Sequence, residues 1–391
     1  MNRDLKAFTL INILRNIVTI YFDTFFAIYF FNLTNYEILP FAKYYLFVYL
    51  SLVIAFWITK NSLKGSLKVP YFRIGLSFTA LYLALIMLLK EKIVNYVYLV
   101  AIIKGLGEGF YYYPRNILNT EKITNANRRK YDGILSCINQ VSSILIPLIL
   151  GILLSMTDYI TIGKYVFVLM VIIFILSFFV CEESKEKKPS NVLKIFKRMW
   201  HNRKLRDVLI IQYLKGWTIS GGVLASVMTI YKILYFKSNF MIGLLNSALG
   251  ILTCITCLLY ATKLKKSQYK NLSILTLVLV TIMLVILSIK PTNWAFIVYL
   301  IVYATGITFI SLCSDSFIAN KSNDLFVALS KEEYHLILET SLGISRVTGH
   351  ALLLVIGLLN NVLYLNYIMF LSIIPFTILI IYLIRNFDDI I

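Results

Sequence analysis

Two apolar stretches of the chain carry charged residues whose types and spacing could bind and release protons. Lys104 and Glu108 lie four residues apart, so they share one face if that stretch is helical. Asp23 lies in the other stretch, eight residues after Arg15. In a helix this spacing is about 12 Å along the axis, too far for an ion pair, so each must find another helix, a water or a ligand. We expect Glu108 to be the first proton-binding group, with Asp23 as the alternative.

Further polar residues inside apolar stretches complete the set that a central pathway would require. Asn12, Asn16, Thr19 and Asp23 follow helical spacing and are expected to form one stripe that faces water rather than lipid. The expected pathway residues are Asn12, Arg15, Asp23, Lys104, Glu108, Gln212, Lys215, Asp315, Arg346 and His350. For His350, packing against a neighbouring helix is the stronger expectation, and a coupling role is the other.

Three more charged residues lie toward the expected cytoplasmic ends of their stretches. Asp132 and Glu339 are expected to hold gating salt bridges with Arg115 or Arg346. Such pairs neutralise charges whose burial in a bilayer would otherwise cost free energy.

The composition shows what solvent surrounds these residues. Of the 391 residues, 59% are hydrophobic, against roughly 45 to 50% in soluble domains, and the mean hydropathy is +0.79. Apolar runs near the 18 to 20 residues that cross a bilayer recur along the whole chain. The first run, 7–31, carries Arg15 and Asp23 and lacks a cleavage site, so it is expected to stay as a span and not to be a signal peptide.

Twelve spans fit this pattern, and the chain is expected to be an all-α integral membrane protein. The spans are predicted at 7–31, 41–60, 70–89, 93–116, 133–156, 161–181, 207–235, 240–262, 270–290, 292–319, 336–360 and 362–384.

The net charge of +19 follows from where the 38 lysines and arginines lie. Most fall in the connections that share one side of the membrane with the N-terminus, which predicts that both termini are cytoplasmic. The outer side is assigned only lysines, Lys232 among them. This asymmetry explains the basic charge without a nucleic-acid partner.

The chain divides into two related halves. A basic connection, 182–206, separates residues 1–181 from residues 207–391, and its second part has the spacing of an amphipathic helix at the membrane surface. A shift of 200 residues places Asn12 on Gln212 and Arg15 on Lys215. Two six-helix repeats with parallel topology are therefore expected, with a site at their interface.

Three local patterns add a resemblance to a known family. The segment Lys104-Gly105-Leu106-Gly107-Glu108-Gly109 is similar to the fourth-helix pattern of the major facilitator superfamily, with lysine in place of arginine. Gly133, Pro147 and Gly151 keep part of the antiporter pattern of its fifth helix. The loop 60–68 keeps the positive charge of the family's loop signature, without its aspartate and paired glycines.

The resemblance covers the full length and implies a secondary active transporter that works by alternating access. Proton coupling and export of amphipathic small molecules in exchange for protons are expected. Uptake of a small metabolite and lipid or glycolipid flipping are the alternatives within transport. The contrasting classes are a membrane-embedded enzyme, for which no catalytic motif is present, and a channel or receptor. No cofactor or metal site is expected, and we expect a monomer in the plasma membrane of a bacterium.

Overall fold

The computed structural model describes residues 3–62, 67–123, 125–181, 197, 200–201, 203–219, 221–262, 266–326, 331–359 and 361–385. Every regular element in this part of the chain is a helix. The second half of the predicted amphipathic connection, 192–199, falls almost entirely outside the described residues, so that expectation stays a prediction.

The N-terminal half contains the helices α1 to α7. Their bounds are Arg3–Ile20 (α1), Tyr21–Phe26 (η1), Ala27–Leu33 (α2), Ile38–Ser62 (α3), Lys68–Leu89 (α4), Lys90–Tyr96 (η2), Val97–Lys122 (α5), Asn125–Met156 (α6), Tyr159–Leu176 (α7) and Ser177–Phe179 (η3). α1, η1 and α2 follow one another without a break, so they form one span.

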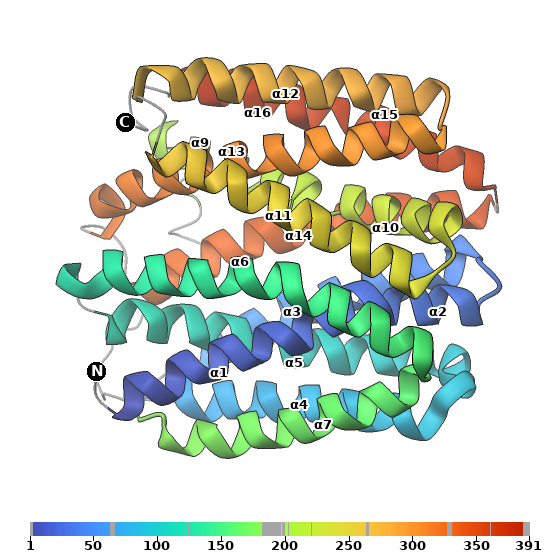
Figure 1. Cartoon of the computed structure of the whole chain (residues 1–391). Helices are drawn as coiled ribbons and strands as arrows, with labels where there is room; N and C mark the ends of the chain where they lie inside the picture. Colours follow the sequence, from blue (N-terminus) through green and yellow to red (C-terminus); the bar gives the residue numbers. More distant parts are fainter. Residues whose placement is uncertain are drawn as a thin grey trace.

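The C-terminal half contains α9 to α16. Their bounds are Arg203–Thr218 (α9), Val223–Phe236 (α10), Asn239–Thr262 (α11), Lys266–Ile289 (α12), Asn293–Phe326 (α13), Lys331–Leu358 (α14), Val362–Tyr364 (η4), Leu365–Leu371 (α15) and Ile373–Arg385 (α16). α9 with α10, and α15 with α16, are broken spans. α1 begins and α16 ends at the same end of the bundle, which we call the terminal end, and the opposite end is the far end (Figure 1).

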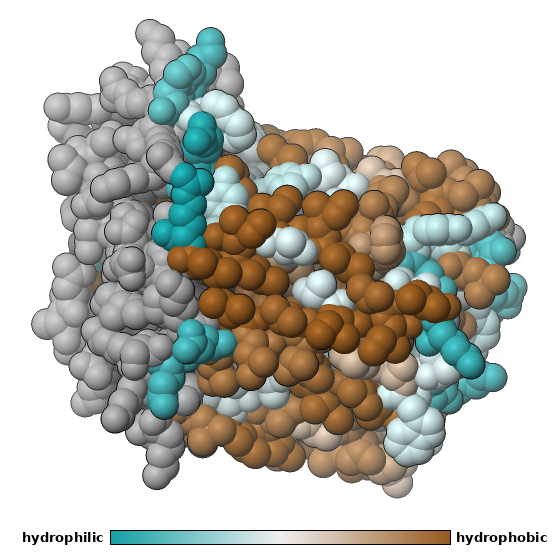
Figure 2. All heavy atoms as spheres, turned by 90° about the horizontal axis from the view of Figure 1, so that it is seen from above, coloured by the Kyte–Doolittle hydropathy of each residue, from teal (hydrophilic) through white to brown (hydrophobic). Residues whose placement is uncertain are grey.

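The described helices have the length and surface of membrane spans. Ten stretches are long and apolar enough to cross a bilayer; one of them, Lys68–Lys122, holds both α4 and α5, and the shorter apolar helix Asn293–Thr308 adds another. A broad hydrophobic surface covers the middle of the molecule, with hydrophilic residues at its edges (Figure 2). The expectation of an all-α membrane protein is confirmed, and the twelve predicted spans correspond to these helices.

One local feature departs from the predicted regular helices. Residues Tyr21–Phe26 form a π-helical segment, with Asp23 inside it. The expected stripe of Asn12, Asn16, Thr19 and Asp23 assumed the 100° step of an α-helix. A π-helix places more residues in each turn, so this step does not hold beyond Ile20. π-helical turns often occur at functional sites, which directs attention to Asp23.

The two halves meet mainly along two helix pairs. α3 packs against α14, and α6 packs against α11. Within the N-terminal half, α5 lies between α3 and α4 and contacts both extensively. Gly105 of α5 makes the approach to α3 possible, because a Cβ there would overlap the carbonyl oxygen of Val48. The close approach of these helices brings the charged residues of α5 next to the interface between the halves.

We predict that Gly105→Ala destabilises the protein, because the added methyl group meets backbone that cannot move without separating α3 from α5. Overpacking of this kind costs about 1–3 kcal/mol. The measurement is the melting temperature of purified protein in detergent. Gly163→Ala is the matched control, since its Cβ would meet side-chain atoms of Tyr21 and Met87 at 3.1 and 3.9 Å. An equal melting temperature for Gly105→Ala and the wild type would contradict the assigned contact.

Candidate functional site

Lys104 lies between two carboxylates in the N-terminal half. Its Nζ is 3.6 Å from Oδ1 of Asp23 and 3.6 Å from Oε1 of Glu108. The first contact joins α5 to η1, and the second joins residues one turn apart on α5. Asp23 thus finds its partner on another helix, as its distance from Arg15 required.

The surroundings of this cluster differ on its two sides. The side chain of Lys104 is only 5% exposed, and its Nζ lies 5.5 Å from the ring centre of Phe22 and 5.9 Å from that of Tyr44. The side chain of Asp23 is 61% exposed, against 15% for Glu108. Asp23 is therefore the open side of the cluster, while aromatic rings and α5 enclose Lys104.

Arg15 belongs to the same region without pairing directly with a carboxylate. Its Nη1 donates a hydrogen bond to Oγ1 of Thr19 at 3.0 Å, and its guanidinium lies 5.3 Å from the ring centre of Tyr111. The sequence separation of Arg15 and Asp23 correctly excluded an ion pair within the helix.

Tyr49 of α3 connects the charged cluster to the C-terminal half. Asp23 and Glu108 are close enough to Tyr49 to interact electrostatically with its hydroxyl. On the other side, the guanidinium of Arg346 lies 5.3 Å from the Tyr49 ring centre, and the His350 ring centre is 4.9 Å away. The side chain of Tyr49 therefore contacts α14 and interacts electrostatically with both carboxylates.

The hydroxyl of Tyr49 also reaches the break between α9 and α10. Gly221 lies in this break with φ of +69°, a conformation that favours glycine. A Cβ at Gly221 would overlap the Tyr49 hydroxyl oxygen. Both the backbone conformation and the close approach thus require glycine here.

His350 is fully buried, and both of its ring nitrogens have partners. Nδ1 donates to the carbonyl oxygen of Arg346, and Nε2 is paired with the hydroxyl of Ser226, each at 2.8 Å. The ring also stacks on Tyr45 of α3, with 5.7 Å between centres. These contacts hold α14 against α10 and α3, and a coupling role for His350 stays a prediction.

A second polar network lies nearer the terminal end of the bundle. Oδ1 of Asn12 accepts hydrogen bonds from Nε of Arg115 at 2.7 Å and from the Tyr111 hydroxyl at 3.0 Å. Nδ2 of Asn116 donates to Oε1 of Glu339 at 3.0 Å. The bond from Asn116 to Glu339 joins α5 to α14 and therefore crosses between the halves.

The gating residues expected from the sequence take part in this network differently from expectation. Glu339 is bonded to Asn116, and Arg115 is bonded to Asn12; in the described part of the chain neither Arg115 nor Arg346 forms an ion pair with Glu339. Both arginines are near enough to Glu339 to interact with it electrostatically. The side chain of Asp132 lies outside the described part, so its gating role stays a prediction.

An ion pair that the sequence analysis did not anticipate joins the halves at the terminal end. Lys68, at the start of α4, pairs with Glu121 of α5 and lies 3.4 Å from Oε1 of Glu332 at the start of α14. The hydroxyl of Tyr113 donates to the carbonyl oxygen of Glu332 at 3.0 Å. We call Lys68, Glu121 and Glu332 the terminal clamp. No short-range sequence pattern could have indicated it, because its members are more than 50 residues apart.

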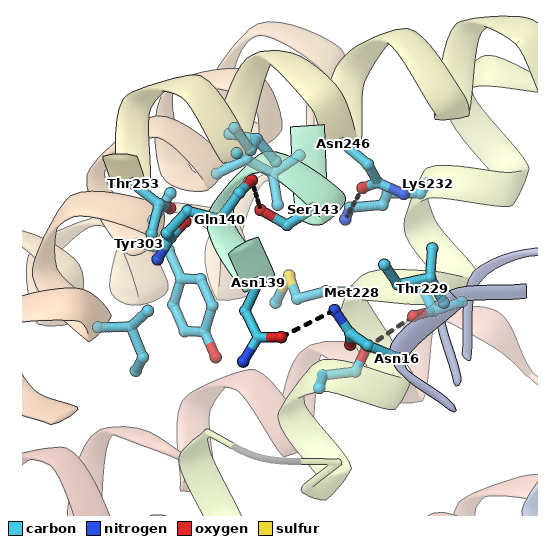
Figure 3. A pocket seen from close by; sticks show the side chains of 17 residues that line it. Asn16, Asn139, Gln140, Ser143, Met228, Thr229, Lys232, Asn246, Thr253 and Tyr303 are labelled. Atoms are coloured by element: carbon cyan, nitrogen blue, oxygen red, sulfur yellow. Dashed lines mark hydrogen bonds between the residues drawn. The ribbon is translucent and has the colours of Figure 1, made fainter. Parts of the chain in front are cut away.

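A cavity of about 600 Å³ lies between the halves. Side chains of α1, α6, α10, α11 and α13 line it (Figure 3). Its polar lining residues are Asn16, Asn139, Gln140, Ser143, Thr229, Lys232, Asn246, Thr253 and Tyr303. Nδ2 of Asn16 donates to Oδ1 of Asn139 at 3.4 Å, so an amide pair joins α1 to α6 at the wall of the cavity.

Lys232 was counted with the outer lysines in the sequence analysis, although it falls within the predicted span 207–235. It lies inside α10 and lines the cavity, where its Nζ donates to Oδ1 of Asn246 at 2.7 Å. Lys232 was counted with the outer lysines because it lies four residues before the end of α10. The hydrogen bond to Asn246 on α11 could not be read from either stretch alone.

The remaining predicted pathway residues lie on helices of the C-terminal half. Gln212 and Lys215 are on α9, with Lys215 buried and close enough to Glu339 to interact electrostatically. Asp315 is on α13, and its side chain is outside the described part. Asn16 is the one residue of the predicted α1 stripe that lines the cavity, while Asn12 is buried against α5.

The residues that match the antiporter pattern have a packing role. Gly151 of α6 faces α11, where a Cβ would lie 3.0 Å from the carbonyl oxygen of Asn239. On α11, a Cβ at Gly243 would overlap the carbonyl oxygen of Pro147. Proline and glycine thus allow α6 and α11 to cross closely at the boundary of the halves, which accounts for these residues without reference to the direction of transport.

Comparisons with known proteins agree with this architecture. The chain is similar to the uncharacterized protein YqgE of Bacillus subtilis (strain 168), with 23% identity over 230 residues. That match covers 57% of this chain and 52% of YqgE, so it spans about half the length of this relative.

Three solved structures share the fold. A bacterial homologue of the iron transporter ferroportin, in an inward-facing state, has a TM-score of 0.69 at 12% identity over 97% of both chains. A variant of the nucleoside transporter NupG has a TM-score of 0.69 at 13% identity over 97% of this chain and 98% of its own. The human organic anion transporter MFSD10 (TETRAN) has a TM-score of 0.63 at 13% identity, over 96% and 99%.

The family itself follows from a direct match to its sequence model. The model described as Major Facilitator Superfamily matches residues 44–324, which is well over half of the chain. The match extends across both halves and the connection between them. The chain is therefore a member of the major facilitator superfamily and a secondary transporter, not an enzyme.

Proposed function

We propose that the protein is a proton-coupled carrier in which the halves 1–181 and 207–391 rock about the cavity between them. The observation that supports this most strongly is Lys104 held at 3.6 Å from both Asp23 and Glu108. Lys104 pairs with both carboxylates, and Arg15 lies within electrostatic reach of Asp23, so two positive charges face two negative ones in this region of the membrane. A proton bound to either carboxylate adds one positive charge to that balanced set, and its release restores the balance.

The free energy associated with one charge inside the membrane is large enough to drive a conformational change. A charge at the centre of a membrane helix costs roughly 2.5 to 3.5 kcal/mol on insertion scales. A shift of this size changes the ratio of two states by roughly 50-fold or more, since 1.4 kcal/mol corresponds to a factor of ten. Asp23 is the residue through which we expect the proton to enter, because its side chain is exposed and that of Glu108 is mostly covered.

Tyr49 supplies a physical route from the proton to the other half. Its ring contacts Arg346 and His350 of α14, and its hydroxyl contacts the α9–α10 break at Gly221. Discharging Asp23 or Glu108 changes the electrostatic field at Tyr49, and we propose that the contact with α14 weakens or strengthens accordingly. α1 provides a second route, since its residues Asn16 and Ile20 line the cavity immediately before the π-helical segment.

The cavity is the proposed substrate site. Its volume of about 600 Å³ suits a small organic solute, and its walls come from both halves. The terminal clamp and the Asn116–Glu339 bond close one end of the space between α5 and α14. Opening of that end requires these contacts to break, which is the movement that alternating access demands.

Export of an amphipathic compound against protons stays the direction predicted from the sequence, where it rests on the partial antiporter pattern; the packing of α6 against α11 adds no support for it. Uptake of a small metabolite and lipid flipping stay the alternatives. The flux experiment below distinguishes them: export and uptake move protons in opposite directions relative to an added substrate, and flipping moves a labelled lipid instead.

We predict that Glu108→Gln abolishes substrate-driven proton movement, because the amide cannot bind and release a proton. The measurement uses proteoliposomes containing a pH-sensitive dye, challenged with drugs, sugars, amino acids, organic acids and lipids. Glu37→Gln, which removes an exposed carboxylate in the connection before α3, is the matched control and should behave as wild type. If an active compound moves protons equally through wild type and Glu108→Gln, Glu108 has no part in coupling.

We predict that Glu332→Gln loosens the terminal end, because it removes the charge on α14 that faces Lys68. Hydrogen–deuterium exchange should rise several-fold in the first turns of α14 and the last turns of α5. Asp4→Asn is the control: it breaks an ion pair of Lys122 at 2.5 Å that lies within the N-terminal half. If both variants raise exchange in α14 equally, or neither does, the clamp does not hold the halves together.

A further inference from the structure

The cavity between the halves contains a cation whose charge is not balanced by a described residue. Lys232 lines the cavity, and its Nζ has one recorded partner, the amide oxygen of Asn246 at 2.7 Å (Figure 3). No aspartate or glutamate is among the described residues that line this cavity. In the same part of the chain, no carboxylate oxygen lies within 4 Å of the Lys232 ammonium nitrogen.

Two acidic residues on helices that line the cavity, Asp315 and Asp132, have a described backbone but no described side chain. Asp315 follows Tyr303 by twelve residues on α13, which is about 18 Å along the helix axis toward the terminal end. Asp132 precedes Asn139 by seven residues on α6, about 10 Å in the same direction. Neither can reach an ammonium group beside Asn246.

Lys232 therefore differs from the other membrane-buried cations that have been described. Lys104 has two carboxylates at 3.6 Å, and Arg346 lies against an aromatic ring within electrostatic reach of Glu339. An unbalanced cation in the membrane interior is costly, and such residues line water-filled cavities or bind ligands of opposite charge.

The direction of the side chain excludes a simple interfacial lysine. Lys232 is four residues, about 6 Å, from the far end of α10, so it could extend outward to the lipid headgroups. Helical side chains instead lean toward the N-terminus of their helix, and α10 begins inside the bundle. The hydrogen bond from Lys232 to Asn246 agrees with this inward direction. Asn246 is seven residues, about 10 Å, from Asn239 at the far end of α11, and so it lies inside the bundle.

The other polar groups of the cavity fit a ligand that carries an acidic group on a small polar body. An ammonium group has three N–H donors, and Asn246 uses one, which leaves two for the oxygens of an anion. Asn139 and Gln140 of α6 and Thr253 of α11 offer further amide and hydroxyl groups to the same cavity. A carboxylate or phosphate oxygen would form charge-assisted bonds with Lys232, the strong class of hydrogen bond.

We propose that Lys232 binds the anionic group of the transported substrate, so that the carrier takes a small organic anion. The proposal rests on the proposed function only in treating this cavity as the substrate site. Carboxylate and phosphate share the recognising chemistry, and a phosphate can come from a free metabolite or from a lipid headgroup. The experiment separates these sources.

The first test measures the charge of the cavity without a known substrate. A single cysteine replaces Thr229, one turn before Lys232 on α10, after the five native cysteines are changed to serine. The cysteine is then modified with thiosulfonate reagents that carry either a sulfonate or a trimethylammonium group. We expect the ratio of the two rates, corrected for a free thiol, to fall at least tenfold in Lys232→Gln and to be kept in Lys232→Arg. An unchanged ratio, or a cysteine that neither reagent modifies, overturns the proposal.

The second test measures binding through protection of the same cysteine. Benzoate, succinate and inorganic phosphate are added at millimolar concentration to protein in neutral detergent, with benzamide as the neutral control. At least one anion should slow the modification fivefold or more, benzamide should not, and Lys232→Gln should remove the effect. Protection by phosphatidylglycerol and by none of the soluble anions would assign the anion to a lipid. Equal protection by benzamide, or protection by no anion, overturns the proposal.

Neither test depends on proton coupling. The labelling rates are measured without a pH gradient or transport, so a failure of the proton experiment with Glu108→Gln leaves these results intact. Conversely, a result that overturns the anion site does not affect the proposal that Asp23 and Glu108 bind the proton.

Discussion

The contact of Lys104 with Asp23 and Glu108 governs how the N-terminal half is built. Water does not compensate charges inside a bilayer, so each ionised group in the core must be matched by an opposite charge, an aromatic face or an open cavity. Lys104 binds η1 to α5 for this reason, and the glycine at position 105 lets α5 approach α3 closely enough to enclose the cluster. The π-helical segment at Asp23 is where this span departs from regular helix to make the contact.

The cluster of Lys104, Asp23 and Glu108, which we propose binds the proton, and the cavity, which we propose binds the substrate, are distinct places, and this determines how they can be coupled. Asp23 and Glu108 do not line the cavity, and Lys232 does not contact them. Coupling between them must therefore pass through elements that both touch. α1 is one, with Asn16 in the cavity and Asp23 two turns later. Tyr49 is the other, since it connects the cluster to α14 and to the α9–α10 break.

Much of the fold, and the Lys104–Glu108 pair of the charged cluster, could be predicted from the sequence. Length and hydropathy determine where spans lie, and a spacing of four residues places Lys104 beside Glu108 in any regular helix. Regular helical spacing did not predict the position of Asp23 on its helix, because the π-helical segment changes the rotation between residues. Local spacing also failed for the terminal clamp and Lys232, whose partners come from distant parts of the chain. The predicted roles of Gln212, Lys215 and Asp315, and the repeat of the halves, stay predictions.

The measurement that tests the account most directly is the distance between the halves at each end of the bundle as a function of pH. Spin labels at Tyr96 and Leu363 report the far end, and labels at Leu67 and Ile384 report the terminal end; all four side chains are exposed. If proton binding at Asp23 and Glu108 drives alternating access, acidification will lengthen one distance and shorten the other, and the double variant D23N/E108Q will be insensitive to pH. Distances that do not change with pH, that change together, or that respond identically in the double variant would contradict the account.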